Sequence, residues 1–164
     1  MTEPIKVKGL ADLQKMLNTL PAKMEKNILR GAMRAGAKPV LAAAKQEAAV
    51  VSGELRDSLK ITGGAKKGNR GQVYAAVKTD KFYGKFVEFG TDPHEIHPKN
   101  REALAVDGKA VELINHPGAK PRPFMRPALD TQAGAAVTAA GEYIKKRLTK
   151  AGLDASGVDV GVEE

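Results

Sequence analysis

The stretch from Leu59 to Thr79, LKITGGAKKGNRGQVYAAVKT, decides the fold class of this 164-residue chain. Leu59 to Thr62 begins one strand. Gln72 to Thr79 forms a second strand, because its apolar residues at 73, 75 and 77 share one face. Four glycines within Gly63 to Gly71 predict an irregular loop. The two runs therefore predict a long antiparallel hairpin.

Helices are predicted on both sides of this hairpin. Leucines at 10, 13, 17 and 20 form one apolar helical stripe, and Pro21 separates it from a longer Ala-rich helix over residues 22–50. A short helix over 83–89 stops at Gly90, and a final helix opens at Pro127 and stops at Gly152. Gly31, Ala35 and Gly36 form a strip of small residues. The strip predicts close helix–sheet packing, with a helix–helix contact between subunits as the alternative.

The remaining segments complete the predicted organisation. Two short apolar runs, Ala103 to Val106 and Ala110 to Ile114, are separated by the turn signal Asp107-Gly108 and predict a second hairpin. The element order predicts an α+β fold, with an antiparallel sheet of hairpins packed against a long N-terminal helix and a C-terminal helix. We expect a single α+β domain over residues 1–152 and a flexible acidic tail over residues 153–164.

The charge is large and unevenly distributed. The chain has 27 Lys and Arg against 19 Asp and Glu, a net charge of +8, and four of the acids lie in the last twelve residues without any base. Residues 1–152 therefore carry a net charge of +12. Such a surface attracts polyanions or simply keeps the protein soluble, and composition leaves both interpretations open. The absence of Trp and the 4% aromatic content argue against a base-stacking platform. No segment predicts a signal peptide or a membrane span.

The sequence holds no recognisable catalytic motif. There is no cysteine, which excludes disulfides and thiolate chemistry, and neither a serine elbow nor a phosphate-binding loop that leads into a helix occurs. His94 and His97 form an H-x-x-H pair, but in an extended segment these side chains point to opposite faces, and His116 lies in another predicted loop. We therefore predict no enzyme, no bound metal and no cofactor.

Two polar segments are the candidate interaction surfaces. The first is a basic loop without an acid, which would touch DNA phosphates or an acidic partner, or would serve as a solvated hairpin tip. Its candidates are Lys60, Lys66, Lys67 and Arg70. The second is a His- and Pro-rich insert over residues 92–120 and the positions that follow it. Its candidate partner-contact residues are His94, His97, Lys99, Arg101, Lys120 and Arg122.

Four segments in this order resemble one protein family. They are GLADL at 9–13, SGELRDS at 52–58, YGKFVEFGT at 83–91 and HPGAKPRPFMRPALD at 116–130. Together they resemble the tail-completion, or head–tail joining, proteins of siphophages, the lambdoid gene-product-ten-like family. The stretch at 96–104 is similar to an insert that many members carry. The third and fourth segments together are the more specific part of the resemblance.

The resemblance implies a structural virion protein of a tailed bacteriophage. It implies a closed homo-oligomeric ring, commonly six-fold, in the neck that links the tail to the DNA-filled head. Implied partners are further copies of the chain, the tail terminator, the head connector or head-closure proteins, and passing double-stranded DNA bound without sequence specificity. It brings no catalytic residue, cofactor or membrane contact. The expected location is the virion after assembly in the host cytoplasm. Phe86, Phe89 and Phe124, within the motifs, are expected to be core anchors.

Overall fold

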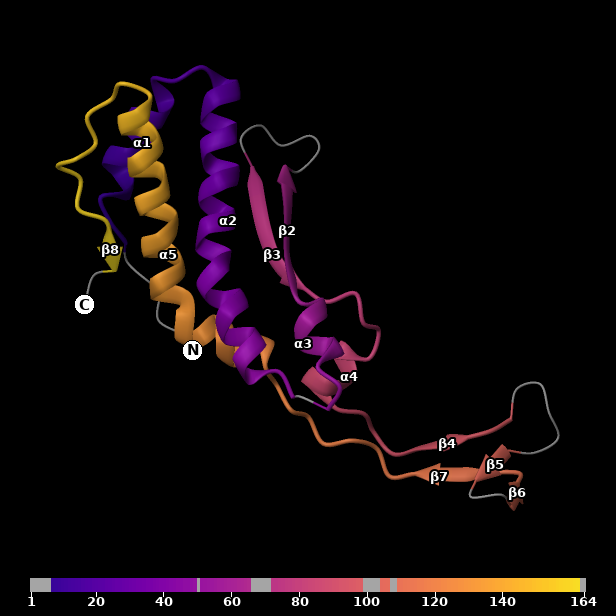
Figure 1. Ribbon diagram of the computed structural model, residues 1–164. Helices are drawn as coiled ribbons and strands as arrows, with labels where there is room; N and C mark the ends of the chain where they lie inside the picture. Colours follow the sequence, from indigo (N-terminus) through magenta and orange to yellow (C-terminus); the bar gives the residue numbers. More distant parts are fainter. Residues whose placement is uncertain (1–6, 50, 66–71, 99–103, 107–108, 163–164) are drawn as a thin grey trace. The chain divides into compact units, whose positions relative to one another are not determined.

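The computed structural model describes residues 7–49, 51–65, 72–98, 104–106 and 109–162 (Figure 1). The fold is α+β, as predicted. The chain forms two compact groups of contacts, a first unit of residues 1–80 with 124–164 and a second unit of residues 81–123, and each is described by itself. The single domain predicted for residues 1–152 stays a prediction. No helix in the described ranges is long and apolar enough to cross a membrane.

Among the described residues, four helices and a hairpin build most of the first unit. The helices are α1 (Leu10–Asn18), α2 (Ala22–Glu47) and α5 (Met125–Lys150), with a short α3 (Glu54–Ser58) after α2. The leucine stripe of α1 is confirmed, because Leu13 and Leu17 are buried against α2 and α5. The last helix begins two residues before the predicted start at Pro127.

Small residues on α2 let it approach α5 closely. A Cβ atom at Gly36 would lie 2.7 Å from the carbonyl oxygen of Ala136, and one at Gly31 would meet the ring of Tyr143. Both neighbours belong to α5, so the strip of small residues serves helix–helix packing within one chain. This finding corrects the expectation of helix–sheet packing. Because α5 of the same chain already contacts Gly31 and Gly36, these two positions do not offer a free surface to another subunit.

The predicted hairpin is confirmed as β2 (Lys60–Ala65) and β3 (Val73–Lys78), which pair antiparallel with Ile61 opposite Val77. The hairpin packs along α2, and β2 points toward the N-terminal end of that helix (Figure 1). The prediction that regular structure ends at Gly63 was wrong, since Gly63 and Gly64 continue β2. A Cβ atom at Gly63 would lie 2.5 Å from the carbonyl oxygen of Tyr74, so glycine fits the close strand approach there.

The residues predicted as a flexible acidic tail pack on the first unit as far as they are described. Ala155 is fully buried, Val160 is nearly so, and the Lys145 ammonium donates a hydrogen bond of 2.8 Å to the carbonyl oxygen of Val158. The terminal strands β1 (Val7–Lys8) and β8 (Gly161–Val162) pair antiparallel. The reason for the difference is that apolar residues at 153, 155, 158 and 160 are interspersed among the acids and join the helical core.

The second unit is a short helix followed by a two-stranded ribbon. It contains α4 (Gly84–Phe89), β4 (His94–Ile96) paired with β7 (Ile114–His116), and β5 (Leu104–Val106) paired with β6 (Lys109–Val111). The β5–β6 pairing confirms the second hairpin, while its turn residues Asp107 and Gly108 lie outside the described residues. Gly90 ends α4 with φ +73°, as the sequence predicted. The described strands form four two-stranded sheets.

Candidate functional site

Only one member of the predicted basic loop lies in the described part of the chain. Lys60 begins β2, and its ammonium lies 2.5 Å from the carboxylate of Asp80. This hydrogen bond is the main cause that lowers the pKa of Asp80 below 3.8. Both side chains are more than half exposed, so solvent screens the pair. The other three members, Lys66, Lys67 and Arg70, lie outside the described residues.

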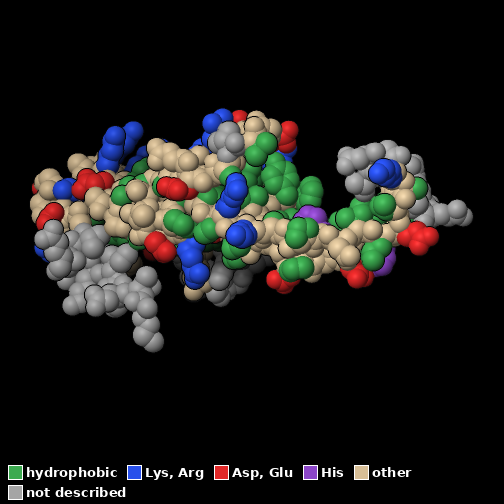
Figure 2. Space-filling model, turned by 90° about the horizontal axis from the view of Figure 1, so that it is seen from below, with side chains coloured by type: hydrophobic (Ala, Val, Ile, Leu, Met, Phe, Trp, Pro, Cys, Tyr) green, Lys and Arg blue, Asp and Glu red, His purple; other side chains and the backbone are tan. Residues whose placement is uncertain are grey.

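The ribbon of the second unit brings together two histidines that the sequence separated. His94 on β4 pairs directly with His116 on β7, and their rings stack with centroids 5.0 Å apart. Only the register between the two strands reveals this pairing, and the periodicity within each strand does not specify that register. Histidine side chains lie at the surface of this unit on the face seen in Figure 2.

The hydrogen bonds of these two rings define which ring nitrogen carries the proton of the neutral form. His94 Nδ1 lies 2.9 Å from the carbonyl oxygen of Asp92, which only accepts, so Nδ1 of His94 carries the proton. The backbone N–H of Gly118 donates to His116 Nδ1 at 3.0 Å, so a neutral His116 carries its proton on Nε2. His116 would have to release Gly118 before Nε2 could bind a metal. Within the described ranges, no three His, Asp or Glu side chains form a metal-binding group.

The remaining insert candidates are dispersed along the second unit. His97 follows β4 and lies 3.4 Å from the carboxylate of Glu95. Lys120 is exposed, and the exposed Arg122 donates its backbone N–H to the carbonyl oxygen of Val87 at the end of α4. The predicted positions Lys99 and Arg101 lie outside the described residues. Those candidates that lie in the described part of the second unit therefore do not form one cluster.

The family-motif phenylalanines divide into a buried and an exposed group. Phe124 is 1% exposed and is a core anchor, as expected, whereas Phe86 is 40% and Phe89 79% exposed. The core-anchor prediction was wrong for these two, because α4 has only six residues and buries Gly84 and Glu88 instead. Phe82, also 79% exposed, packs edge-on against Phe86, and the Lys85 ammonium lies over the Phe86 ring at 4.8 Å. The exposed cluster is therefore aromatic and basic.

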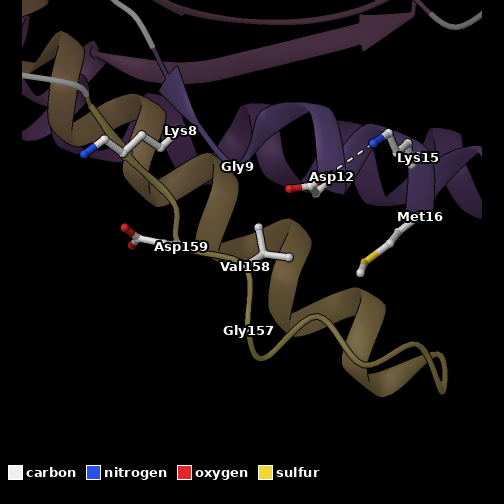
Figure 3. Close-up of a pocket in the computed structure, with 8 residues that line it drawn as sticks. All are labelled: Lys8, Gly9, Asp12, Lys15, Met16, Gly157, Val158 and Asp159. Atoms are coloured by element: carbon white, nitrogen blue, oxygen red, sulfur yellow. Dashed lines mark ion pairs between the residues drawn. The ribbon is translucent and has the colours of Figure 1, made fainter.

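A shallow depression of about 450 Å³ lies between the start of α1 and the C-terminal segment (Figure 3). Figure 3 shows Lys8 and Asp159 on one side and the ion pair of Asp12 with Lys15, at 3.6 Å, on the other. Gly9, Met16, Gly157 and Val158 complete the lining. The lining contains neither a histidine nor a hydroxyl or thiol group, and its ionisable side chains are those of two lysines and two aspartates.

A basic row on α2 was missed by the sequence interpretation, which followed only the apolar side of that helix. Its members, each four residues from the next and all exposed, are Lys26, Arg30, Arg34 and Lys38. The four-residue spacing was the available signal. The face shown in Figure 2 carries both basic and acidic side chains, so the net charge of the chain does not locate a basic surface. The four side chains of this row, in contrast, are all basic.

The comparison with protein families finds a similarity to phage tail components. Residues 11–90 match the family model described as "Bacteriophage HK97-gp10, putative tail-component". The resemblance predicted from the sequence is confirmed over this stretch, which is similar to the HK97 gp10-like family of phage tail components. The match covers α1, α2, the β2–β3 hairpin and α4. No curated protein and no solved structure matches the chain.

Proposed function

We propose that this chain is a non-enzymatic, ring-forming adaptor that completes the phage tail and joins it to the DNA-filled head. The family match over residues 11–90 is the observation that carries the proposal. The order of the four sequence motifs supports the finer role at the neck. The motif at 116–130 lies beyond the matched stretch, and the motif at 83–91 ends one residue after it. The protein would be a virion component that is assembled in the host cytoplasm.

The work of such an adaptor is mechanical. Heterologous contacts between identical copies, in a ring that we propose to be a hexamer, would close the assembly. One face of the ring would meet the tail terminator, and the other would meet the head connector or head-closure proteins. The second unit carries an exposed aromatic cluster and an exposed ribbon, which are surfaces of the kind that partners cover. The lumen would accommodate passing double-stranded DNA without reading its sequence.

Imaging of particles assembled without this protein tests the proposal. Infected cells that lack the gene should contain separate tails and DNA-filled heads, and supplying the chain from a plasmid should restore joined particles. A lysate with joined, normal particles in the absence of the protein would show that it is not the joining adaptor. Tails of altered length, or the absence of tails, would indicate a different tail component.

The alternative is a free nucleic-acid-binding protein that uses the basic hairpin loop. The observation that favours it is the net charge of +8. Neutralising Lys66, Lys67 and Arg70 should then abolish salt-dependent DNA binding by the purified monomer, while heads and tails still join in cells that carry the same variant. Loss of joining without a change in DNA binding would favour the adaptor.

A further inference from the structure

A row of four basic side chains runs along α2 and has no ion-pair partner among the described residues. Lys26, Arg30, Arg34 and Lys38 are all exposed. Among the described residues, the ion pairs are made by other cations, and none joins a member of this row to an acid. Like charges four residues apart on a helix destabilise it. The row therefore has uncompensated charge that an external anion would neutralise.

The row lies on the side of α2 that is turned away from the residues packed on α5, and its side chains are exposed although the β2–β3 hairpin also packs along α2. Ile28, Ala32 and Gly36 are buried on the face that packs against α5. Each basic residue is two positions from one of these buried residues, which corresponds to a rotation of about 200° around an α-helix. Because both rows advance in steps of four, the basic row stays opposite the face that packs on α5 along its whole length.

The dimensions of the row suit an extended anion. A rise of 1.5 Å per residue gives steps of about 6 Å and a length of about 18 Å from Lys26 to Lys38. That length is roughly half of one turn of B-form DNA, which rises 34 to 36 Å. Two of the four groups are arginines, whose planar guanidinium groups bind phosphate with two hydrogen bonds. A single small anion would meet only one or two of these cations.

We propose that the basic row of α2 binds the phosphate backbone of double-stranded DNA without reading its sequence. Helix α2 contains no aromatic residue on which unpaired bases could stack, which favours a duplex over a single strand. An even, linear series of cations fits a regular phosphate backbone, whereas an acidic protein would have to present carboxylates at the same interval. The inference deepens the proposed function and rests on it for the source of the DNA, the genome that passes the neck.

The test compares variants of the full chain in DNA binding. The row variant is Lys26→Gln, Arg30→Gln, Arg34→Gln, Lys38→Gln. The matched control, Lys109→Gln, Lys146→Gln, Arg147→Gln, Lys150→Gln, removes the same charge from exposed positions elsewhere. Fluorescence anisotropy of a labelled 30-base-pair duplex of random sequence is measured from low to moderate salt. Circular dichroism establishes that each variant is folded.

The slope of log affinity against log salt decides the outcome. Neutralising four phosphate contacts should reduce its magnitude by about 3 to 4, because each contact contributes about 0.9. The control should change the slope by less than about one, and the charge-retaining variant Arg30→Lys, Arg34→Lys should keep it. Equal losses in the row variant and the control would overturn the site, since only net charge would then matter. Unchanged binding in the row variant would also overturn it.

Two further outcomes separate this inference from the proposed function. A row variant that binds DNA like the unmodified chain but fails to join heads and tails would indicate an acidic protein partner on α2, and would overturn the DNA inference alone. The second outcome combines two results: the purified row variant loses salt-dependent DNA binding, and phage particles join in the absence of the protein. Together these results would support the DNA inference and contradict the adaptor role. Joining is scored by imaging and DNA contact by anisotropy, so the two readouts are independent.

Discussion

At the scale of single residues, burial distinguishes phenylalanines that the sequence treats alike. Phe124 is 1% exposed and Phe89 is 79% exposed, although both lie in family motifs. Phe124→Ala should therefore cost about 3–5 kcal/mol of unfolding free energy, the range for a large aromatic removed from a core. Phe89→Ala, at a surface position, should change it by less than about 0.5 kcal/mol. Urea denaturation measures both values, and similar losses in the two variants would contradict the structure of α4.

The ion pair of Lys60 with Asp80 makes a prediction about pH. The hydrogen bond from Lys60 lowers the pKa of Asp80 below 3.8 in the folded chain. The stabilisation is therefore complete above about pH 3.8 and is lost as the pH falls through the lowered folded-state pKa. Asp80→Asn should be slightly less stable than the unmodified chain at pH 6, and the difference should disappear in acid. Asp130→Asn, at an exposed position of α5, is the control, and a difference that grows in acid would contradict the prediction.

Residue types alone show local preference but not the neighbour that a residue meets. Gly63 is a strand residue although its glycine-rich context predicts a loop, because the backbone of Tyr74 lies too close for a side chain. Gly90, by contrast, ends its helix where the sequence predicts, since the positive φ is a local requirement. The basic loop is predicted by its composition. The basic row of α2 is not, because the apolar periodicity that predicts the helix carries no information on the spacing of its charged residues.

At the scale of elements, periodicity predicts helices and strands but not the surfaces that they share. The stripe of leucines predicts α1, and alternation predicts β3, because each pattern depends on residues a few positions apart. The pairing of His94 with His116 and the packing of α2 on α5 join residues that are distant in sequence. One sequence without aligned relatives holds no direct signal for such pairs. The candidate sites were therefore predicted as segments, and their geometry required the structure.

The C-terminal segment allows an element-scale test. A Cβ atom at Gly141 of α5 would lie 2.0 Å from Cγ1 of Val160, so Gly141→Ala should destabilise the chain by about 1–3 kcal/mol through overpacking. Gly157, with nothing within 4 Å of its Cβ position, is the control and should tolerate Ala within about 0.5 kcal/mol. Thermal unfolding measures both. If the segment were a flexible tail, Gly141→Ala would instead stabilise the helix, because alanine has the higher helix propensity.

At the scale of the whole molecule, the positive charge opposes the assembly that we propose. Every copy in a ring repeats a net charge of +8, so the protomers repel one another at low ionic strength. Salt screens this repulsion, and the Debye length falls from about 30 Å at 0.01 M to about 8 Å at 0.15 M. Ring formation by the purified chain should therefore increase with moderate salt. DNA binding by the α2 row should weaken over the same range, because it depends on the release of counterions.

Mass measurement by light scattering after size exclusion tests this opposite salt dependence. We expect a shift from monomers toward a particle of about six protomers as the concentration and the salt rise, since a ring of identical heterologous contacts closes at a fixed number. A continuous distribution of masses would indicate open filaments or aggregation instead. A monomer at every salt and concentration, also after purified tails are added, would contradict the ring. Assembly that weakens with salt would show that charge pairs, rather than apolar contacts, hold the protomers together.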